Sequence, residues 1–147
     1  MAALAAHPLP DPREAAQALV GNRSSEWLDA FSEALGRQRA GAELRRILQV
    51  WGLSQSEAAR RFGVSRQAVA KWLASGVPAN RVKAVADYSA ATDVLVHYVK
   101  SDRIPAMVRR SAPALGESSL LDLLGAGRHR DLLEACRAMF DFSRVQG

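Results

Sequence analysis

Side chains able to bind a polyanion are concentrated between residues 41 and 83. This segment holds eight basic and two acidic residues, whereas residues 1–40 hold four and five, and residues 84–147 hold eight of each. The segment therefore accounts for the whole net charge of +5. Its cations are Arg45, Arg46, Arg60, Arg61, Arg66, Lys71, Arg81 and Lys83. Such a cluster can displace counterions from a phosphate backbone, although most charge runs are solvated helix faces.

Catalytic residues are harder to find. Cys136 is the only cysteine, and His7, His97 and His129 do not have metal-ligand spacing. No phosphate-binding glycine loop follows a strand pattern, and no nucleophile has a partner in context. We therefore expect no enzymatic activity, no metal and no cofactor. Cys136 lies on an apolar stripe and is expected to be a buried small hydrophobe.

The composition and patterning predict an all-α fold. Of 147 residues, 48% are hydrophobic and 24% charged, as in an ordinary globular protein. Neither an alternating strand pattern nor a hairpin turn occurs in the chain. No stretch approaches the roughly 18 consecutive apolar residues of a membrane helix. Residues 1–6 lack the basic start of a secretion signal, so we expect a cytoplasmic protein.

Apolar periodicity predicts helices on both sides of the basic segment. A first stripe follows a capping serine at 24 or 25 and is expected to loosen between Gly36 and Gly41. Its residues are Trp27, Leu28, Phe31, Ala34 and Leu35. A second stripe covers 44–51 and ends at Gly52. Beyond these we expect a long helix over 79–100 and shorter ones at 103–110, 118–124 and 128–141.

Residues 53–73 predict two short helices joined by a tight turn. Ser54 and Glu57 have the spacing of a capping box at the first helix. Gly63 permits the turn, and Ser65 can cap the second helix. The expected inward residues are Ala58, Ala59, Phe62, Val64, Ala68, Val69 and Trp72. Residues 66, 67 and 71 then project together from the outer face, because 67 and 71 are i,i+4 neighbours.

This segment resembles the lambda-repressor-like, Xre-type helix-turn-helix family over about residues 41–88. The resemblance is carried by Leu53-Ser54-Gln55, Ala58-Ala59, Phe62-Gly63-Val64-Ser65-Arg66-Gln67 and Trp72. In that family the second helix of the motif enters the major groove of DNA. The resemblance implies base contacts by Arg66, Gln67 and Lys71, since Arg and Lys donate to guanine and Gln pairs with adenine. It further implies phosphate contacts by Gln55, Ser65, Asn80 and Arg81.

From about Arg103 onward, the sequence is similar to the toxin-binding C-terminal domain of RES–Xre antitoxins, the MbcA/ParS type. The similarity rests on Pro113-Ala114-Leu115-Gly116, the Leu-rich run that follows it, and Leu132-Leu133. It implies a domain that covers the active-site cleft of an NAD-degrading RES-type toxin. The candidate partner-binding residues are Leu115, Leu120, Leu124, Phe140 and Phe142. The alternative is a small dimerisation domain in which these apolar residues are simply core.

These patterns predict a lambda-repressor-like bundle plus a small C-terminal helical domain. The expected divisions are a mobile tail over 1–22, with at most a helical turn near 14–19, a DNA-binding domain over 23–100, and a partner-binding or dimerisation domain over 101–147. The expected function is sequence-specific transcriptional regulation by the antitoxin and autorepressor of a RES–Xre pair. A homodimer on a palindromic double-stranded DNA operator is expected, because one recognition helix reads few base pairs. The alternatives are a stand-alone or phage-type repressor and an architectural DNA-packaging protein.

Overall fold

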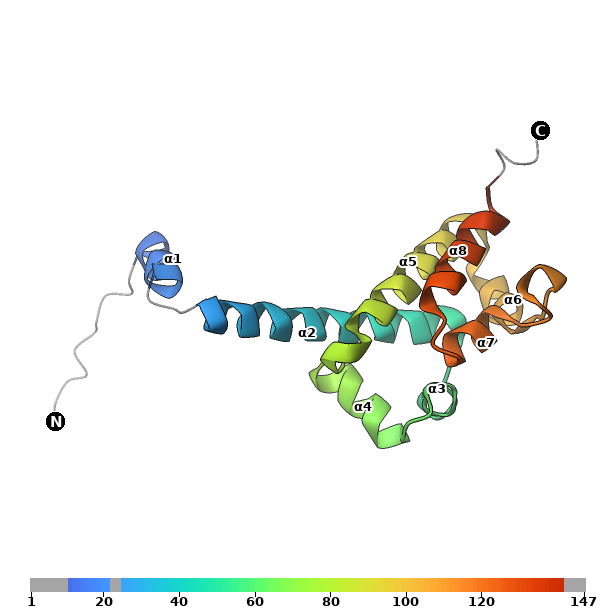
Figure 1. Ribbon diagram of the computed structural model, residues 1–147, viewed down its shortest axis with the longest axis horizontal. Helices are drawn as coiled ribbons and strands as arrows, with labels where there is room; N and C mark the ends of the chain where they lie inside the picture. The colour runs from blue at the N-terminus through green and yellow to red at the C-terminus, as the bar shows by residue number, and fades with distance from the viewer. Residues whose placement is uncertain (1–10, 22–24, 142–147) are drawn as a thin grey trace. The chain divides into compact units, whose positions relative to one another are not determined.

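The computed structural model describes residues 11–21 and 25–141, and within these ranges the protein is all-α (Figure 1). The predicted fold class is confirmed. An isolated bridge between Ala112 and Ser118 is the one β-type pairing in the described ranges. The α-helices are α1 (Pro12–Gly21), α2 (Ser25–Trp51), α3 (Gln55–Phe62), α4 (Arg66–Ser75), α5 (Val82–Tyr98), α6 (Ile104–Arg109), α7 (Leu120–Gly125) and α8 (His129–Met139). Short 3-10 helices are η1 (Ala79–Arg81), η2 (Ser101–Arg103) and η3 (Pro113–Leu115).

The chain forms two compact units, Met1–Glu33 and Ala34–Gly147. The first contains α1, which is longer than the helical turn predicted near residues 14–19; residues 1–10 and 22 lie outside the described ranges. Asp11 accepts a hydrogen bond from the amide of Arg13 (3.0 Å) and so caps the helix. Pro12 occupies the first helical position, where its missing N–H costs nothing.

Helix α2 is continuous over 27 residues, where the sequence predicts two helices separated near Gly36 and Gly41. A Cβ atom at Gly36 would meet nothing within 4 Å, so packing does not require this glycine; it costs about 1 kcal/mol relative to alanine, which a long helix tolerates. Gly41 is needed for packing rather than for a break. A Cβ atom at this position would lie 2.7 Å from the carbonyl oxygen of Trp72, so the glycine lets α4 approach α2. The predicted loosening of the helix between Gly36 and Gly41 is therefore wrong.

The first part of α2 carries its apolar stripe at the protein surface. Trp27 and Phe31 stack with 5.3 Å between ring centroids, and the side chain of Phe31 remains about half exposed. Leu28 is also exposed. The predicted helical spacing of these residues is confirmed.

One hydrophobic core joins the predicted DNA-binding and C-terminal regions in the second unit. It includes Trp51 from α2, Val69 from α4, Leu95 from α5, Leu124 from α7 and Leu132 from α8. Helices α5 and α8 lie side by side in Figure 1, and Cys136 of α8 is fully buried, as predicted. Because these side chains are shared, the predicted domain boundary at residues 100 and 101 does not separate two cores. No helix among the described residues is long and apolar enough to cross a membrane.

A buried chain of hydrogen bonds runs through this core. The indole Nε1 of Trp51 donates to Oγ1 of Thr92 (3.0 Å), which donates to the carbonyl oxygen of Tyr88 (2.7 Å). The hydroxyl of Tyr88 donates to the carbonyl oxygen of Leu124 (3.2 Å). Buried polar groups are costly unless they are paired, so this chain fixes the register of α2, α5 and α7 against one another.

Candidate nucleic-acid interface

The turn between α3 and α4 is set by local capping. Ser54 accepts a hydrogen bond from the amide of Glu57 (3.1 Å), and Ser65 accepts one from the amide of Ala68 (3.0 Å). Gly63 adopts a left-handed conformation with φ of 67°, which ends α3. The amide of Val64 then donates to the carbonyl oxygen of Ala59 (3.0 Å). The two predicted short helices and the tight turn between them are therefore present in the fold.

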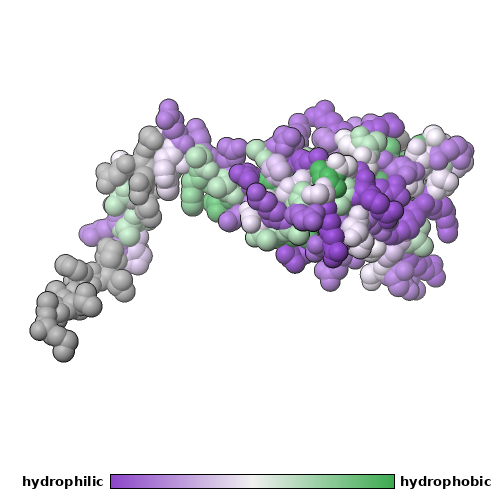
Figure 2. Space-filling view, turned by 90° about the horizontal axis from the view of Figure 1, so that it is seen from below, coloured by the Kyte–Doolittle hydropathy of each residue, from purple (hydrophilic) through white to green (hydrophobic). Residues whose placement is uncertain are grey.

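The two faces of α4 differ as predicted. Val69 and Trp72 are buried, and Ala68 is half-buried, whereas Arg66, Gln67 and Lys71 are all exposed. None of these three polar side chains makes a hydrogen bond or ion pair within the described part of the chain. Figure 2 views the molecule from below, the side on which α3 and α4 lie in Figure 1, and hydrophilic residues cover much of that face. The outer face of α4 is thus open to a partner.

The four predicted phosphate contacts occupy different environments. Gln55 is the first residue of α3 and is exposed, and Asn80 is exposed in η1. The oxygen of Ser65 accepts the capping bond, and its hydroxyl hydrogen remains a donor. The guanidinium of Arg81 lies over the Trp72 ring, 4.8 Å from its centroid, and is half-buried. Arg81 is therefore held by an aromatic surface instead of extending into solvent.

The basic cluster divides into engaged and unengaged cations. Arg45 donates to the carbonyl oxygen of Leu73 (3.0 Å), Arg46 pairs with Asp93, and Arg61 pairs with Asp122 (3.0 Å). With Arg81, half of the eight cations have a contact inside the protein. The four without a hydrogen bond, ion pair or ring contact among the residues that the structure describes are Arg60, Arg66, Lys71 and Lys83. Arg60 and Lys83 thus join the candidate interface. Exposure alone does not distinguish them, since Arg45 is exposed too; the absence of a partner among the described residues does.

The carboxylate of Glu57 has a different partner from the one that the sequence predicts. Its amide donates to Ser54, but its carboxylate binds the guanidinium of Arg109 from α6, at 3.0 and 3.2 Å, instead of returning to the Ser54 amide. The predicted reciprocal capping box is therefore only half formed. Nη2 of Arg109 donates charge-assisted bonds to both carboxylate oxygens, which a single neutral amide cannot match. Glu57, one of the two acidic residues in the basic segment 41–83, is thus neutralised by Arg109, which lies outside that segment.

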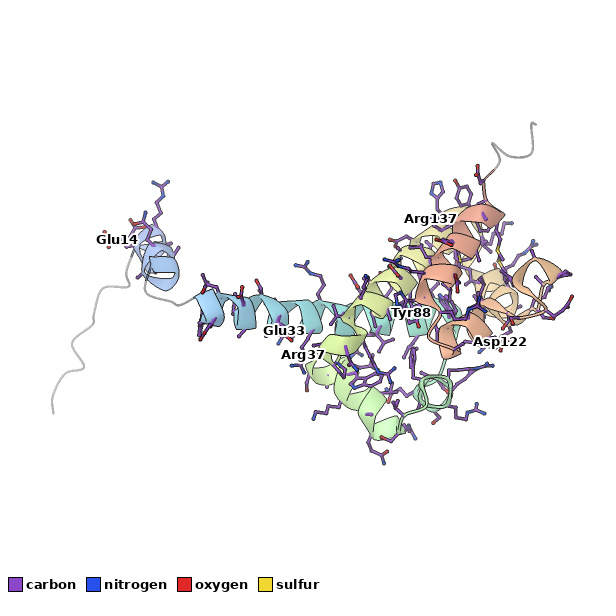
Figure 3. The ribbon with its side chains drawn as sticks, in the orientation of Figure 1. Glu14, Glu33, Arg37, Tyr88, Asp122 and Arg137 are labelled. Atoms are coloured by element: carbon purple, nitrogen blue, oxygen red, sulfur yellow. The ribbon has the colours of Figure 1, made fainter. Side chains whose placement is uncertain are left out.

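A complete capping box occurs instead at α7, where none was predicted. Ser119 accepts from the Asp122 amide (3.0 Å), and Asp122 accepts from the Ser119 amide (2.9 Å). The Ser119 amide, followed by the Ser119 side chain, holds the pKa of Asp122 below its usual value, and Arg61 adds a smaller effect. A serine three residues before an aspartate, at the start of a Leu-rich run, was the available signal. Asp122, labelled in Figure 3, connects α7 to α3.

The predicted partner-binding residues are not one surface. Leu120 and Leu124 are buried in the core, so they cannot contact a partner in this conformation; their apolar spacing reflected packing instead. Leu115 is half-buried and lines a groove of about 900 Å³ between η3 and α8. Phe140 stacks on Tyr98 with ring centroids 4.8 Å apart. Phe142 lies outside the described residues.

Comparisons with family models, curated proteins and solved structures found no match for this chain. Within the described residues, no group of three His, Cys, Asp or Glu side chains is placed to hold a metal ion. The geometry of α3, α4 and their surroundings is therefore the basis for a functional assignment.

Proposed function

We propose that this protein is a sequence-specific double-stranded DNA-binding regulator that reads bases with α4. The observation that carries the proposal is the shared exposure of Arg66, Gln67 and Lys71 on one face of α4, without hydrogen-bond or ion-pair partners elsewhere in the described chain. Side chains of these types satisfy the donor and acceptor patterns of guanine and adenine in the major groove. The helix is capped at Ser65, so its first turn is ordered before DNA arrives.

The flanking groups supply sequence-independent affinity. Gln55 stands at the N-terminus of α3, where backbone amides and side chain can together approach a phosphate. Arg60 and Lys83 add unengaged charge on either side of the motif. Salt should weaken binding steeply, because each neutralised phosphate releases counterions. A homodimer on a palindromic operator belongs to this proposal, since two recognition helices multiply the affinity of one.

The direct test selects binding sites from a random duplex library and measures their affinity by fluorescence anisotropy. Arg66→Ala should cost about 1–3 kcal/mol on the selected site and relax selectivity at one base-pair position. The matched control is Arg130→Ala, which removes an exposed arginine from α8 and should leave affinity unchanged. Failure to enrich any sequence, or equal losses from the two substitutions, would contradict base reading by α4.

A second proposal concerns the C-terminal helices, which resemble the toxin-binding domain of RES–Xre antitoxins. The groove between η3 and α8 favours it, because both apolar residues, such as Leu115 and Leu123, and charged residues, such as Glu134 and Arg137, line it. Arg137 is labelled on α8 in Figure 3. A RES-type toxin encoded beside this chain should co-purify with it. Leu115→Ala should weaken that complex while DNA affinity stays unchanged, and ring-sized oligomers without a toxin would instead favour DNA packaging.

A further inference from the structure

A cavity of about 420 Å³ lies where the helix-turn-helix meets the C-terminal helices. Phe62 of α3, Trp72 of α4 and Tyr88 of α5 line it, together with residues of α7 and His129 of α8. Figure 3 labels Tyr88 on α5 in the middle of this unit. The volume is in the range of cavities that hold small organic ligands. Asn80, Arg81 and Lys83 line this space and also belong to the candidate DNA interface, whereas the aromatic lining residues take no part in the proposed base contacts.

Three aromatic rings form part of the cavity wall. The ring of Phe62 lies 6.1 Å from that of Trp72 and 6.4 Å from that of Tyr88, between centroids, with tilted planes. Leu44, Val77 and Val85 are buried residues that also line the space. Such walls favour a flat apolar body, which can pack against rings without requiring hydrogen bonds.

Tyr88 does not offer a polar group to a ligand. Its hydroxyl donates to the carbonyl oxygen of Leu124, and burial raises the pKa of the phenol, an effect that Arg81 partly opposes. Polar recognition must therefore come from the other polar lining residues, which are Asn80, Arg81, Lys83 and His129.

The charge of these residues is positive. Arg81 lies over the Trp72 ring, and Lys83 is exposed without a partner among the described residues. The nearby carboxylate of Asp87 is taken by His129 Nδ1 at 2.5 Å, and no acidic side chain of the described chain lines the cavity itself. An anionic group placed beside Arg81 and Lys83 would find complementary charge, whereas a cationic one would be repelled.

We propose that this cavity binds a small anion with a flat apolar body, such as an aromatic carboxylate. The ring system lies against Phe62, Trp72 and Tyr88, and the carboxylate faces Arg81 and Lys83. A phosphate group alone would use the cations but leave the aromatic wall bare, and a neutral ring would use the wall alone. The combination of both features selects this ligand class.

Ligand binding should oppose DNA binding, a consequence that rests on the proposed function. Trp72 belongs to α4, and Arg81 is a candidate phosphate contact, so both sites share residues. A bound anion neutralises Arg81 and Lys83 and lowers the positive potential next to the DNA-binding face. The ligand therefore reduces DNA affinity, and DNA reduces ligand affinity by the same factor.

The first experiment titrates the isotope-labelled full chain with 2-naphthoate, followed by NMR, and repeats the titration with the neutral 2-naphthamide. Saturable shifts should centre on the Trp72 indole and on the amides of Gly125 and Gly127, which line the cavity. The amide should bind about tenfold more weakly. Shifts that never saturate, that centre elsewhere, or that are equal for both compounds would overturn the proposal.

Two substitutions and a control localise the effect. Ala84→Leu fills the cavity from α5 and should weaken naphthoate binding by about tenfold or more. Lys83→Gln removes an exposed charge and cannot disturb the core, so it decides the outcome if the first variant does not fold. It should weaken naphthoate several-fold and leave naphthamide unchanged. Lys100→Gln, an exposed lysine that does not line the cavity, should change neither. Equal losses from both lysine variants would refute the site.

The second experiment repeats the DNA anisotropy measurement with saturating naphthoate. A lower DNA affinity in the wild type, absent in Lys83→Gln, supports the coupling. Naphthoate binding without sequence-selective DNA binding would remove the proposed function and leave the cavity assignment intact. Sequence-selective DNA binding without naphthoate binding would refute the cavity assignment and leave the proposed function intact. The two failures are therefore distinguishable.

Discussion

The outer face of α3 and α4 and the helices α6 and α7 use charged side chains in opposite ways. On α3 and α4, Arg60, Arg66 and Lys71 are exposed and unengaged within the described chain. On α6 and α7, Arg109 and Asp122 are committed to bonds with other helices of the same unit. The outer face of α3 and α4 thus presents charge to a partner, whereas the charged residues of α6 and α7 hold α3 in position.

This difference shows why a segment's net charge is an incomplete guide to its role. The C-terminal region is neutral in sum, yet it supplies Arg109 to Glu57 and Asp122 to Arg61, both of which lie on α3. These bonds clamp α3 from one side while the shared core holds α4 through Val69 and Trp72. The C-terminal helices are accordingly a support for the DNA-binding motif as well as a candidate partner surface.

The largest expected effect comes from removing the support altogether. A chain that ends at residue 100 should lose cooperative unfolding in urea, followed by circular dichroism. It would delete the buried side chains Ile104, Val108, Leu120, Leu121, Leu123, Leu124 and Leu132. Each contributes roughly 1.5–3 kcal/mol, and the sum exceeds the usual stability of a domain. A chain over 25–147 is the control and should melt as the full chain does; an independently folding 1–100 would restore the predicted domain boundary.

A smaller effect separates core from surface inside the C-terminal region. Leu124→Ala should destabilise the protein by about 2–5 kcal/mol, because a fully buried leucine leaves a cavity. Leu115→Ala, at a half-buried site beside the groove, should cost roughly 1 kcal/mol or less. Urea denaturation midpoints measure both. Similar losses at the two positions would mean that η3 is as deeply packed as α7.

The helix-turn-helix could be predicted because its signals are local. Ser54, Gly63 and Ser65 act within a few residues of themselves, and the alternation of inward and outward residues on α4 follows from helical period alone. Exposure of the three candidate base-reading residues follows from the same period. Capping signals and helical period therefore predict α3, the turn and α4, because each depends only on a short segment of the sequence.

The remainder depended on contacts between distant residues. Gly41 is a helix-breaking residue by propensity, and only the approach of Trp72 reveals its role in packing. Likewise, no spacing rule pairs Arg109 with Glu57 across 52 positions or places Leu124 beneath Tyr88. The Ser119 and Asp122 box is the exception, since its local spacing was visible in the sequence. Partner choice for charged side chains is a tertiary property.

The next largest loss of stability is expected when the hydrogen bonds of Arg109 are removed. Its guanidinium donates to the carbonyl oxygens of Trp51 (3.1 Å) and Gly52 (3.1 Å) and to the Glu57 carboxylate. Arg109→Ala should lower the free energy of unfolding by about 1–2 kcal/mol, a value discounted because a third of the side chain is exposed. Arg109→Lys should recover less than half, since an ammonium cannot reproduce the planar fork. Full recovery by lysine would show that charge alone matters.

The smallest expected effect is a pH dependence at the second connection to α3. Because its pKa is lowered in the folded state, Asp122 stabilises the protein at pH values above its unfolded pKa of 3.8, and the stabilisation disappears as pH falls through the folded value.

Asp122→Asn keeps a side-chain acceptor for the Ser119 amide but loses the ion pair with Arg61. Its free energy of unfolding, measured with urea, should lie below that of the wild type by less than about 1 kcal/mol near neutral pH, because half of the carboxylate side chain is exposed. The gap should narrow as pH falls below 3.8 and should close once the pH lies below the lowered folded pKa, where the carboxylate of the folded wild type is protonated. Asp102→Asn, at an exposed carboxylate in η2, should show no such convergence. A gap that persists in acid would assign the loss to the altered cap and would mean that the charge of Asp122 does not hold α3.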